Sequence, residues 1–156
     1  MKVMFDTQIY DLVIAELGMT QTLNSLATKG VLKILTTHIQ QGEIQGIPNE
    51  EKRRMISEII TECVTTSGAV YGVSVYNMAT YGDGNTGGFG IDDVRSKTGG
   101  HTNDALIATT ASRDADVLVT EDKRLANRLK QLNTQTKVWL FADLKQYLSD
   151  SKQDRE

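Results

Sequence analysis

Two kinds of hydrophobic pattern alternate along this chain. Short apolar runs, typical of buried strands, lie at residues 3–5, 31–35, 117–119 and 138–140. Between them, apolar residues recur every three to four positions, as in amphipathic helices, at residues 9–17, 20–30, 49–64, 105–111, 125–132 and 141–148. Strands that alternate with helices predict an α/β protein with a mostly parallel central sheet and helices on both faces, a three-layer α/β/α fold.

One helix has an especially clear pattern. Asn49 can cap its start, and Glu50 and Glu51 in the first turn suit the positive end of the helix dipole. The apolar residues that follow at helical spacing are Met55, Ile56, Ile59, Ile60, Cys63 and Val64. This spacing predicts a long helix with Cys63 on its buried face.

Two segments carry weaker patterns. Residues 70–75 fit either a strand or part of a helix, and residues 82–100 contain seven glycines and predict a loop. Residues 82–87 match the Gly-x-Gly-x-x-Gly dinucleotide fingerprint, but Gly88 and Gly90 follow where that motif needs a helix to open. We therefore interpret the segment as a loop, either on the plain surface or beside a substrate groove.

The composition fits one folded domain. Of 156 residues, 39% are hydrophobic and 24% are charged, which predicts a single domain at 1–149 followed by a polar, frayed tail at 150–156. No apolar stretch approaches the ~20 residues of a membrane span. The single Cys63 excludes an intramolecular disulfide and suits a reducing compartment. We expect a cytoplasmic protein that has no membrane partner.

The overall charge is mildly acidic. A net charge of −3 and a pI of about 5.4 are not typical of nucleic-acid-binding proteins, which usually carry a basic surface. A local basic cluster nevertheless occurs at Lys123, Arg124, Arg128 and Lys130. It forms either a solvated helix face or a positive surface beside a substrate. Bound divalent cations would also offset acidic charge locally.

Four carboxylates stand at the ends of apolar segments. Asp6 and Asp122 follow predicted strands, and Glu43 ends a short segment after the second strand. Asp104 lies in the first turn of a helix that Thr102 or Asn103 can cap. Because open α/β sheets place their chemistry at the carboxyl ends of strands, we expect these acids to meet there. They would repel one another unless a divalent cation held them together.

The order and spacing of four segments resemble the PIN-domain nucleases over almost the whole chain. These segments are residues 3–7, 37–44, 103–108 and 118–122. The resemblance implies a PIN-like fold and a metal-dependent ribonuclease, and many family members are toxins of toxin–antitoxin pairs. It also implies Mg²⁺ or Mn²⁺ as cofactor, RNA as substrate, an antitoxin protein as partner, and a homodimer. Its acidic tetrad would be Asp6, Glu43, Asp104 and Asp122, supported by Thr7 and Thr120.

Three positions depart from the family pattern. Gln8 stands where asparagine is common, and Gly42 where a further acid is expected. Glu121 adds an acid beside Asp122, which leaves open which of the two faces the metal. Oxygen ligands suit Mg²⁺ or Mn²⁺ and disfavour zinc. In this hypothesis Asp6 and Asp104 bind the metal directly, while Glu43 and Asp122 act through water or hold a second ion.

Basic residues flank two of the acids. Lys123 and Arg124 directly follow Asp122, and we expect them to face the RNA backbone. Arg95 and Lys97 precede Asp104, where they either contact phosphates or are solvated loop charges.

The leading hypothesis is therefore a metal-dependent endoribonuclease, with a toxin of a toxin–antitoxin pair as one form of it. The alternative is a catalytically weak or inactive RNA-binding protein with a PIN fold. A phosphoacceptor signalling domain fits poorly, because it needs an acidic pair after the first strand and a late lysine.

Overall fold

The computed structural model describes residues 1–67, 79–80, 102–123, 126–127 and 134–153. The strands are β1 (Lys2–Phe5), β2 (Lys33–Thr36), β3 (Glu62–Cys63), β4 (Thr66–Ser67), β5 (Ala79–Thr80), β6 (Val117–Val119) and β7 (Lys137–Trp139). The helices are α1 (Thr7–Ala15), α2 (Met19–Thr28), α3 (His38–Gln45), α4 (Glu50–Ser57), α6 (Thr102–Asp114) and α8 (Phe141–Gln153).

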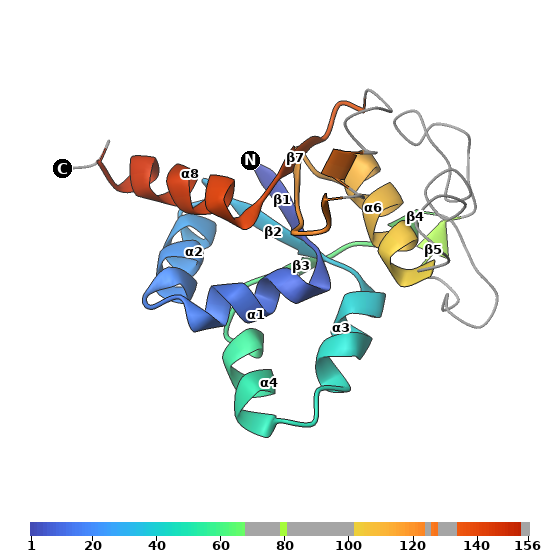
Figure 1. The fold of residues 1–156 in the computed structure, drawn as a ribbon, viewed down its shortest axis with the longest axis horizontal. Helices are drawn as coiled ribbons and strands as arrows, with labels where there is room; N and C mark the ends of the chain where they lie inside the picture. The colour runs from blue at the N-terminus through green and yellow to red at the C-terminus, as the bar shows by residue number, and fades with distance from the viewer. Residues whose placement is uncertain (68–78, 81–101, 124–125, 128–133, 154–156) are drawn as a thin grey trace.

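The central sheet is parallel throughout. Its strand order is β3-β2-β1-β6-β7, and β4 pairs with β5 in a separate two-stranded sheet (Figure 1). In the middle strand, Met4 is in register with Leu35 on one side and Leu118 on the other. This arrangement confirms the predicted three-layer α/β/α fold.

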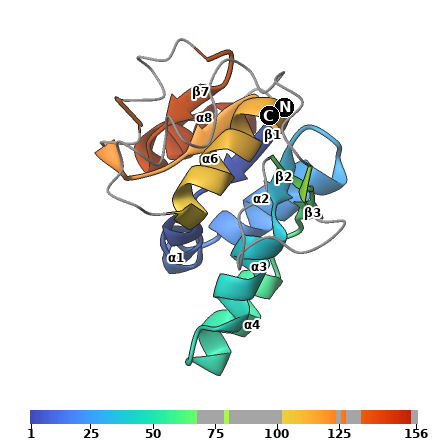
Figure 2. The same ribbon diagram turned by 90° about the vertical axis from the view of Figure 1, so that its right-hand side faces the viewer.

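Alternation along β1 divides the core between the two faces of the sheet. Val3 and Phe5 pack into one cluster with apolar residues of α1, α2 and α8. Met4 points the other way, into a second cluster that includes Ala108 and Ala111 of α6. Figure 2 shows α6 lying beside the sheet, with which it is in contact at β1 and β6. Because successive strand residues face opposite sides, a three-residue apolar run is enough to build both layers.

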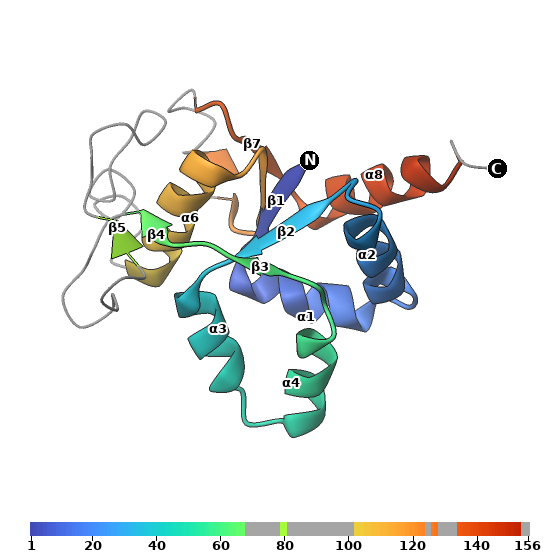
Figure 3. The ribbon, with the colours of Figure 1, turned by 180° about the vertical axis from the view of Figure 1, so that it is seen from behind.

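The long helix predicted for residues 49–64 is wrong beyond Ser57. Helix α4 ends there, and Glu62 and Cys63 form the edge strand β3 beside β2 (Figure 3). The side chain of Asn24 on α2 contacts the turn between α4 and β3. Its Nδ2 donates to the carbonyl of Glu58 at 2.7 Å, and its Oδ1 accepts from the backbone N–H of Ile60 at 2.9 Å.

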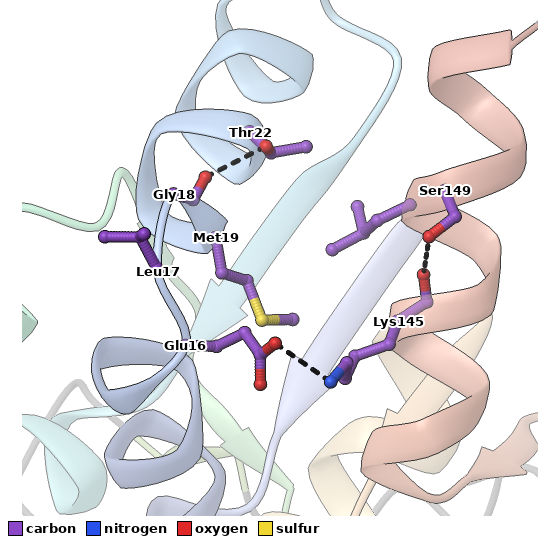
Figure 4. A pocket seen from close by; sticks show the side chains of 8 residues that line it. Glu16, Leu17, Gly18, Met19, Thr22, Lys145 and Ser149 are labelled. Carbon is purple, nitrogen blue, oxygen red and sulfur yellow. Dashed lines mark hydrogen bonds and ion pairs between the residues drawn. The ribbon is translucent and has the colours of Figure 1, made fainter.

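The final helix is longer than predicted. Helix α8 continues to Gln153, so residues 150–153 of the expected frayed tail are helical. Leu148 is buried in the core, and Lys145 pairs with Glu16 at 2.9 Å across a small pocket beside α2 (Figure 4). The Ser149 hydroxyl donates to the Lys145 carbonyl at 3.0 Å. These contacts hold a polar segment in helical form.

Three predicted segments lie wholly or largely outside the described residues. They are the segment 70–75, the glycine-rich loop 82–100 and most of the helix 125–132, of which residues 126 and 127 are described as helical. Within the described part of the chain, no helix has the length and apolar character needed to cross a bilayer.

Candidate active site

Asp6 lies at the carboxyl end of β1, where the strand order of the sheet reverses. From β1 the chain adds β2 and β3 on one side, whereas β6 and β7 lie on the other. Asp6 follows β1 directly and occupies the N-cap position of α1 without a side-chain capping bond, and its backbone N–H donates to the Val119 carbonyl at 2.9 Å. Such a switch point, outside the carboxyl ends of the strands, is where open α/β folds form their binding crevice.

Two neutral side chains fix the carboxylate of Asp6. Its Oδ2 accepts from Gln8 Nε2 at 2.9 Å and from the Thr120 hydroxyl at 2.8 Å. The residue is 7% exposed. Gln8, at the position where the PIN resemblance leads one to expect asparagine, therefore donates to the Asp6 carboxylate. Both of these bonds are made to Oδ2.

Thr120 joins two of the acids. It is fully buried at the end of β6, and its backbone N–H donates to the Trp139 carbonyl at 3.0 Å. While its hydroxyl donates to Asp6, the same oxygen accepts from the backbone N–H of Asp122 at 3.1 Å. A single hydroxyl thus sets the position of Asp122 relative to Asp6.

Glu43 comes to the site on α3. This helix begins in a capping box, in which Thr37 accepts from the backbone N–H of Gln40 and Gln40 accepts from that of Thr37. Glu43 lies one turn further on, and its Oε2 accepts from the Thr7 hydroxyl at 2.5 Å. The short segment expected before Glu43 is therefore the body of a capped helix.

Glu121 and Asp122 have different surroundings. Glu121 is exposed, and its Oε1 accepts from the backbone N–H of Phe141 at 2.7 Å, at the first residue of α8. Asp122 is half-buried, and its carbonyl accepts from the Ala126 N–H at 2.9 Å as a helical turn opens. Glu121 thus serves the N-terminus of a helix, where a carboxylate is favourable.

These side chains line one open cleft with a volume of about 520 Å³. Its lining residues are Asp6, Thr7, Gln8, Glu43, Glu121 and Asp122. Four of the six are carboxylates, and the described lining contains no lysine or arginine. Like charges gathered in a concave site raise the local attraction for cations. The donor set consists of hard oxygens, which is the set that Mg²⁺ and Mn²⁺ prefer.

The structure leaves several predicted site residues untested. Asp104 is the third residue of α6, but its side chain lies outside the described set, as do Arg95, Lys97 and Arg124. Lys123 is described and exposed next to Asp122. Among the described side chains, which exclude that of Asp104, no three acidic, histidine or cysteine residues converge as a metal-binding group. Mg²⁺ often uses only one or two carboxylates and keeps several waters, so it does not need such a group.

One residue important to this geometry was not predicted from the sequence. Gln40 is fully buried, and its Nε2 donates to the carbonyl of Phe5, the residue before Asp6. The Thr37-x-x-Gln40 spacing was a readable capping-box signal. The contact with Phe5 was not readable, because it joins residues 35 positions apart.

Comparisons with known proteins give no match. A scan against models of protein families, a search of curated proteins and a search of solved structures each find nothing similar to this chain.

Proposed function

We propose that this protein is a metal-dependent endoribonuclease with a PIN-like organisation. The observation that carries the proposal is the acidic cleft at the switch point of the sheet, with Asp6 at its base. Phosphodiester cleavage requires stabilisation of negative charge on the phosphate, and bare carboxylates cannot supply it. A cleft of this composition suits that reaction when it holds a divalent cation.

The residues that would hold the cation are Asp6 and Asp104, with Glu43 and Asp122 acting through water. A bound Mg²⁺ or Mn²⁺ supplies a more acidic water and offsets charge on the phosphate oxygens. Asp6 is preorganised for this role because Gln8 and Thr120 fix its carboxylate. The bond between Glu121 and the start of α8 favours Asp122 as the acid on the metal side.

Substrate and partners follow from the same proposal. Lys123, with Arg124, Arg95 and Lys97, would contact the RNA backbone on the rim of the acidic cleft. The PIN resemblance adds a homodimer, an antitoxin protein as partner and a cytoplasmic location to the proposal.

Asp6→Asn tests the proposal most directly. The substitution keeps the size and hydrogen-bonding shape of the side chain but removes its charge, so we expect Mg²⁺-dependent cleavage of single-stranded RNA to fall at least ~100-fold. Asp116→Asn is the matched control, because Asp116 is an exposed acid at the opposite end of β6. Circular dichroism should show both variants folded, and EDTA should abolish wild-type cleavage. A folded, fully active Asp6→Asn protein would reject the proposal.

The alternative is an RNA-binding protein that keeps the fold without efficient catalysis. The same samples separate the two functions. RNA retained in a gel-shift assay with EDTA, without cleavage in Mg²⁺ or Mn²⁺, would support the alternative.

A further inference from the structure

Asp6 is flanked in the sequence by two hydrogen bonds to α3. On one side, the Gln40 amide donates to the carbonyl of Phe5. On the other side, the Thr7 hydroxyl donates to Glu43 Oε2 at 2.5 Å. Gln40 and Glu43 are three residues apart, so they lie one turn apart on the same face of α3. Two hydrogen bonds therefore connect α3 to the residues on either side of Asp6.

Both ends of the Gln40 amide are used. Its Oε1 accepts from the backbone N–H of Thr37 at 3.0 Å, and its Nε2 donates to Phe5. The side chain is fully buried, which long polar residues tolerate only when their polar atoms are paired. Either glutamine or glutamate can complete a capping box. Only glutamine also has the N–H that reaches the Phe5 carbonyl, so the second contact explains the residue type.

We propose that Gln40 is a positioning residue that sets Glu43 against Asp6 across the cleft. This inference rests on the proposed function, because it assumes that the two carboxylates serve one metal site. Gln40 itself touches neither metal nor substrate; it acts through the Phe5 carbonyl and through α3. Residues that orient metal-binding carboxylates typically change metal affinity by about 10- to 100-fold when they are removed.

Three variants test the inference. Gln40→Met keeps the length of the side chain but removes the donor to Phe5. Thr7→Val removes the hydrogen bond to Glu43. Because Thr7 is partly exposed, this variant replaces Gln40→Met if that protein does not fold. Gln41→Met is the matched control, because Gln41 is the exposed neighbour of Gln40 on the same helix.

The main measurement is Mn²⁺ binding, followed by the loss of the free-ion signal in electron paramagnetic resonance. We expect Gln40→Met and Thr7→Val to weaken Mn²⁺ binding by about tenfold or more, and Gln41→Met to leave it unchanged. In RNA cleavage, the metal concentration for half-maximal rate should rise by the same factor, while the KM for RNA stays constant. A merely structural role would lower thermal stability without changing the Mn²⁺ affinity of the folded protein.

The possible outcomes distinguish a failure of the proposed function from a failure of the role of Gln40. If the wild-type protein binds no Mn²⁺, the proposed function falls and the inference falls with it. If the wild type binds Mn²⁺ and the folded Gln40→Met and Thr7→Val proteins bind it equally well, the inference alone is overturned. If Gln40→Met does not fold, the Mn²⁺ affinity of Thr7→Val decides.

Discussion

Three acids of the cleft, Asp6, Glu43 and Glu121, accept hydrogen bonds from neutral donors. The donors are the Gln8 amide, the Thr7 and Thr120 hydroxyls and the backbone N–H of Phe141. A neutral donor orients a carboxylate without cancelling its charge, which suits a site that must attract a cation. The Thr120 hydroxyl makes two contacts, because it donates to Asp6 and accepts from the backbone N–H of Asp122.

The neighbouring acids Glu121 and Asp122 should respond differently to neutralisation. Glu121→Gln keeps an oxygen that can accept from the Phe141 N–H, so we expect cleavage to stay within about threefold of wild type. Asp122→Asn removes a charge from the metal side, so we expect cleavage and Mn²⁺ affinity to fall at least ~10-fold. Initial rates with single-stranded RNA in Mg²⁺ measure both effects. The opposite ranking of the two variants would assign the metal to Glu121.

At the scale of elements, local patterns predicted four strands of the central sheet, including the edge strand β7, and missed β3 at the other edge. Apolar runs marked β1, β2, β6 and β7. The first three strands are buried along most of their length, whereas in β7 only Val138 is buried, between the exposed Lys137 and the half-buried Trp139. The spacing of the apolar residues after α4 fits a helix as well as it fits a turn and a strand. Pairing with β2 and the reach of Asn24 from α2 decide between them, and neither is local in sequence.

Asn24 should therefore be a stability determinant although it is only half-buried on its helix. Asn24→Ala leaves the Glu58 carbonyl and the Ile60 N–H without their side-chain partner, and we expect it to lower the free energy of unfolding by about 1–3 kcal/mol. Urea denaturation followed by circular dichroism measures the change. Gln21→Ala, on the same helix, is the control. Equal stability of the two variants would show that the turn before β3 forms without Asn24.

At the scale of the whole molecule, the parallel topology makes the site. Thr120 and Asp6 are 114 residues apart in sequence and 2.8 Å apart in space, because β1 and β6 are neighbours. The rule that acids at strand ends meet at one sheet edge was therefore enough to predict that Asp6 and Asp122 lie in one cleft. The anchoring role of Glu121 and the contact of Gln40 depend on the reach of single side chains, which no sequence pattern encodes.

The core beneath the cleft should make stability sensitive to alkaline pH. Tyr10 is 1% exposed on α1, with its ring edge-on to Phe5 at 5.5 Å. Burial raises the pKa of Tyr10 to about 12, against a smaller lowering by the nearby Thr36 hydroxyl. Below pH ~10 the phenol is protonated in both the folded and the unfolded chain, so its contribution to stability is fully present.

Above that pH the unfolded chain ionises first, and stability is lost as the pH rises toward the folded pKa. The expected loss from Tyr10 is about 1.4 kcal/mol per pH unit between pH ~10 and ~12. Tyr10→Phe keeps the ring and removes the titrating group, so its free energy of unfolding should fall less steeply over this range. Urea denaturation of both proteins at several pH values gives the two slopes, and background titration of other residues cancels in their difference. Parallel slopes would mean that the Tyr10 hydroxyl reaches solvent in the folded protein.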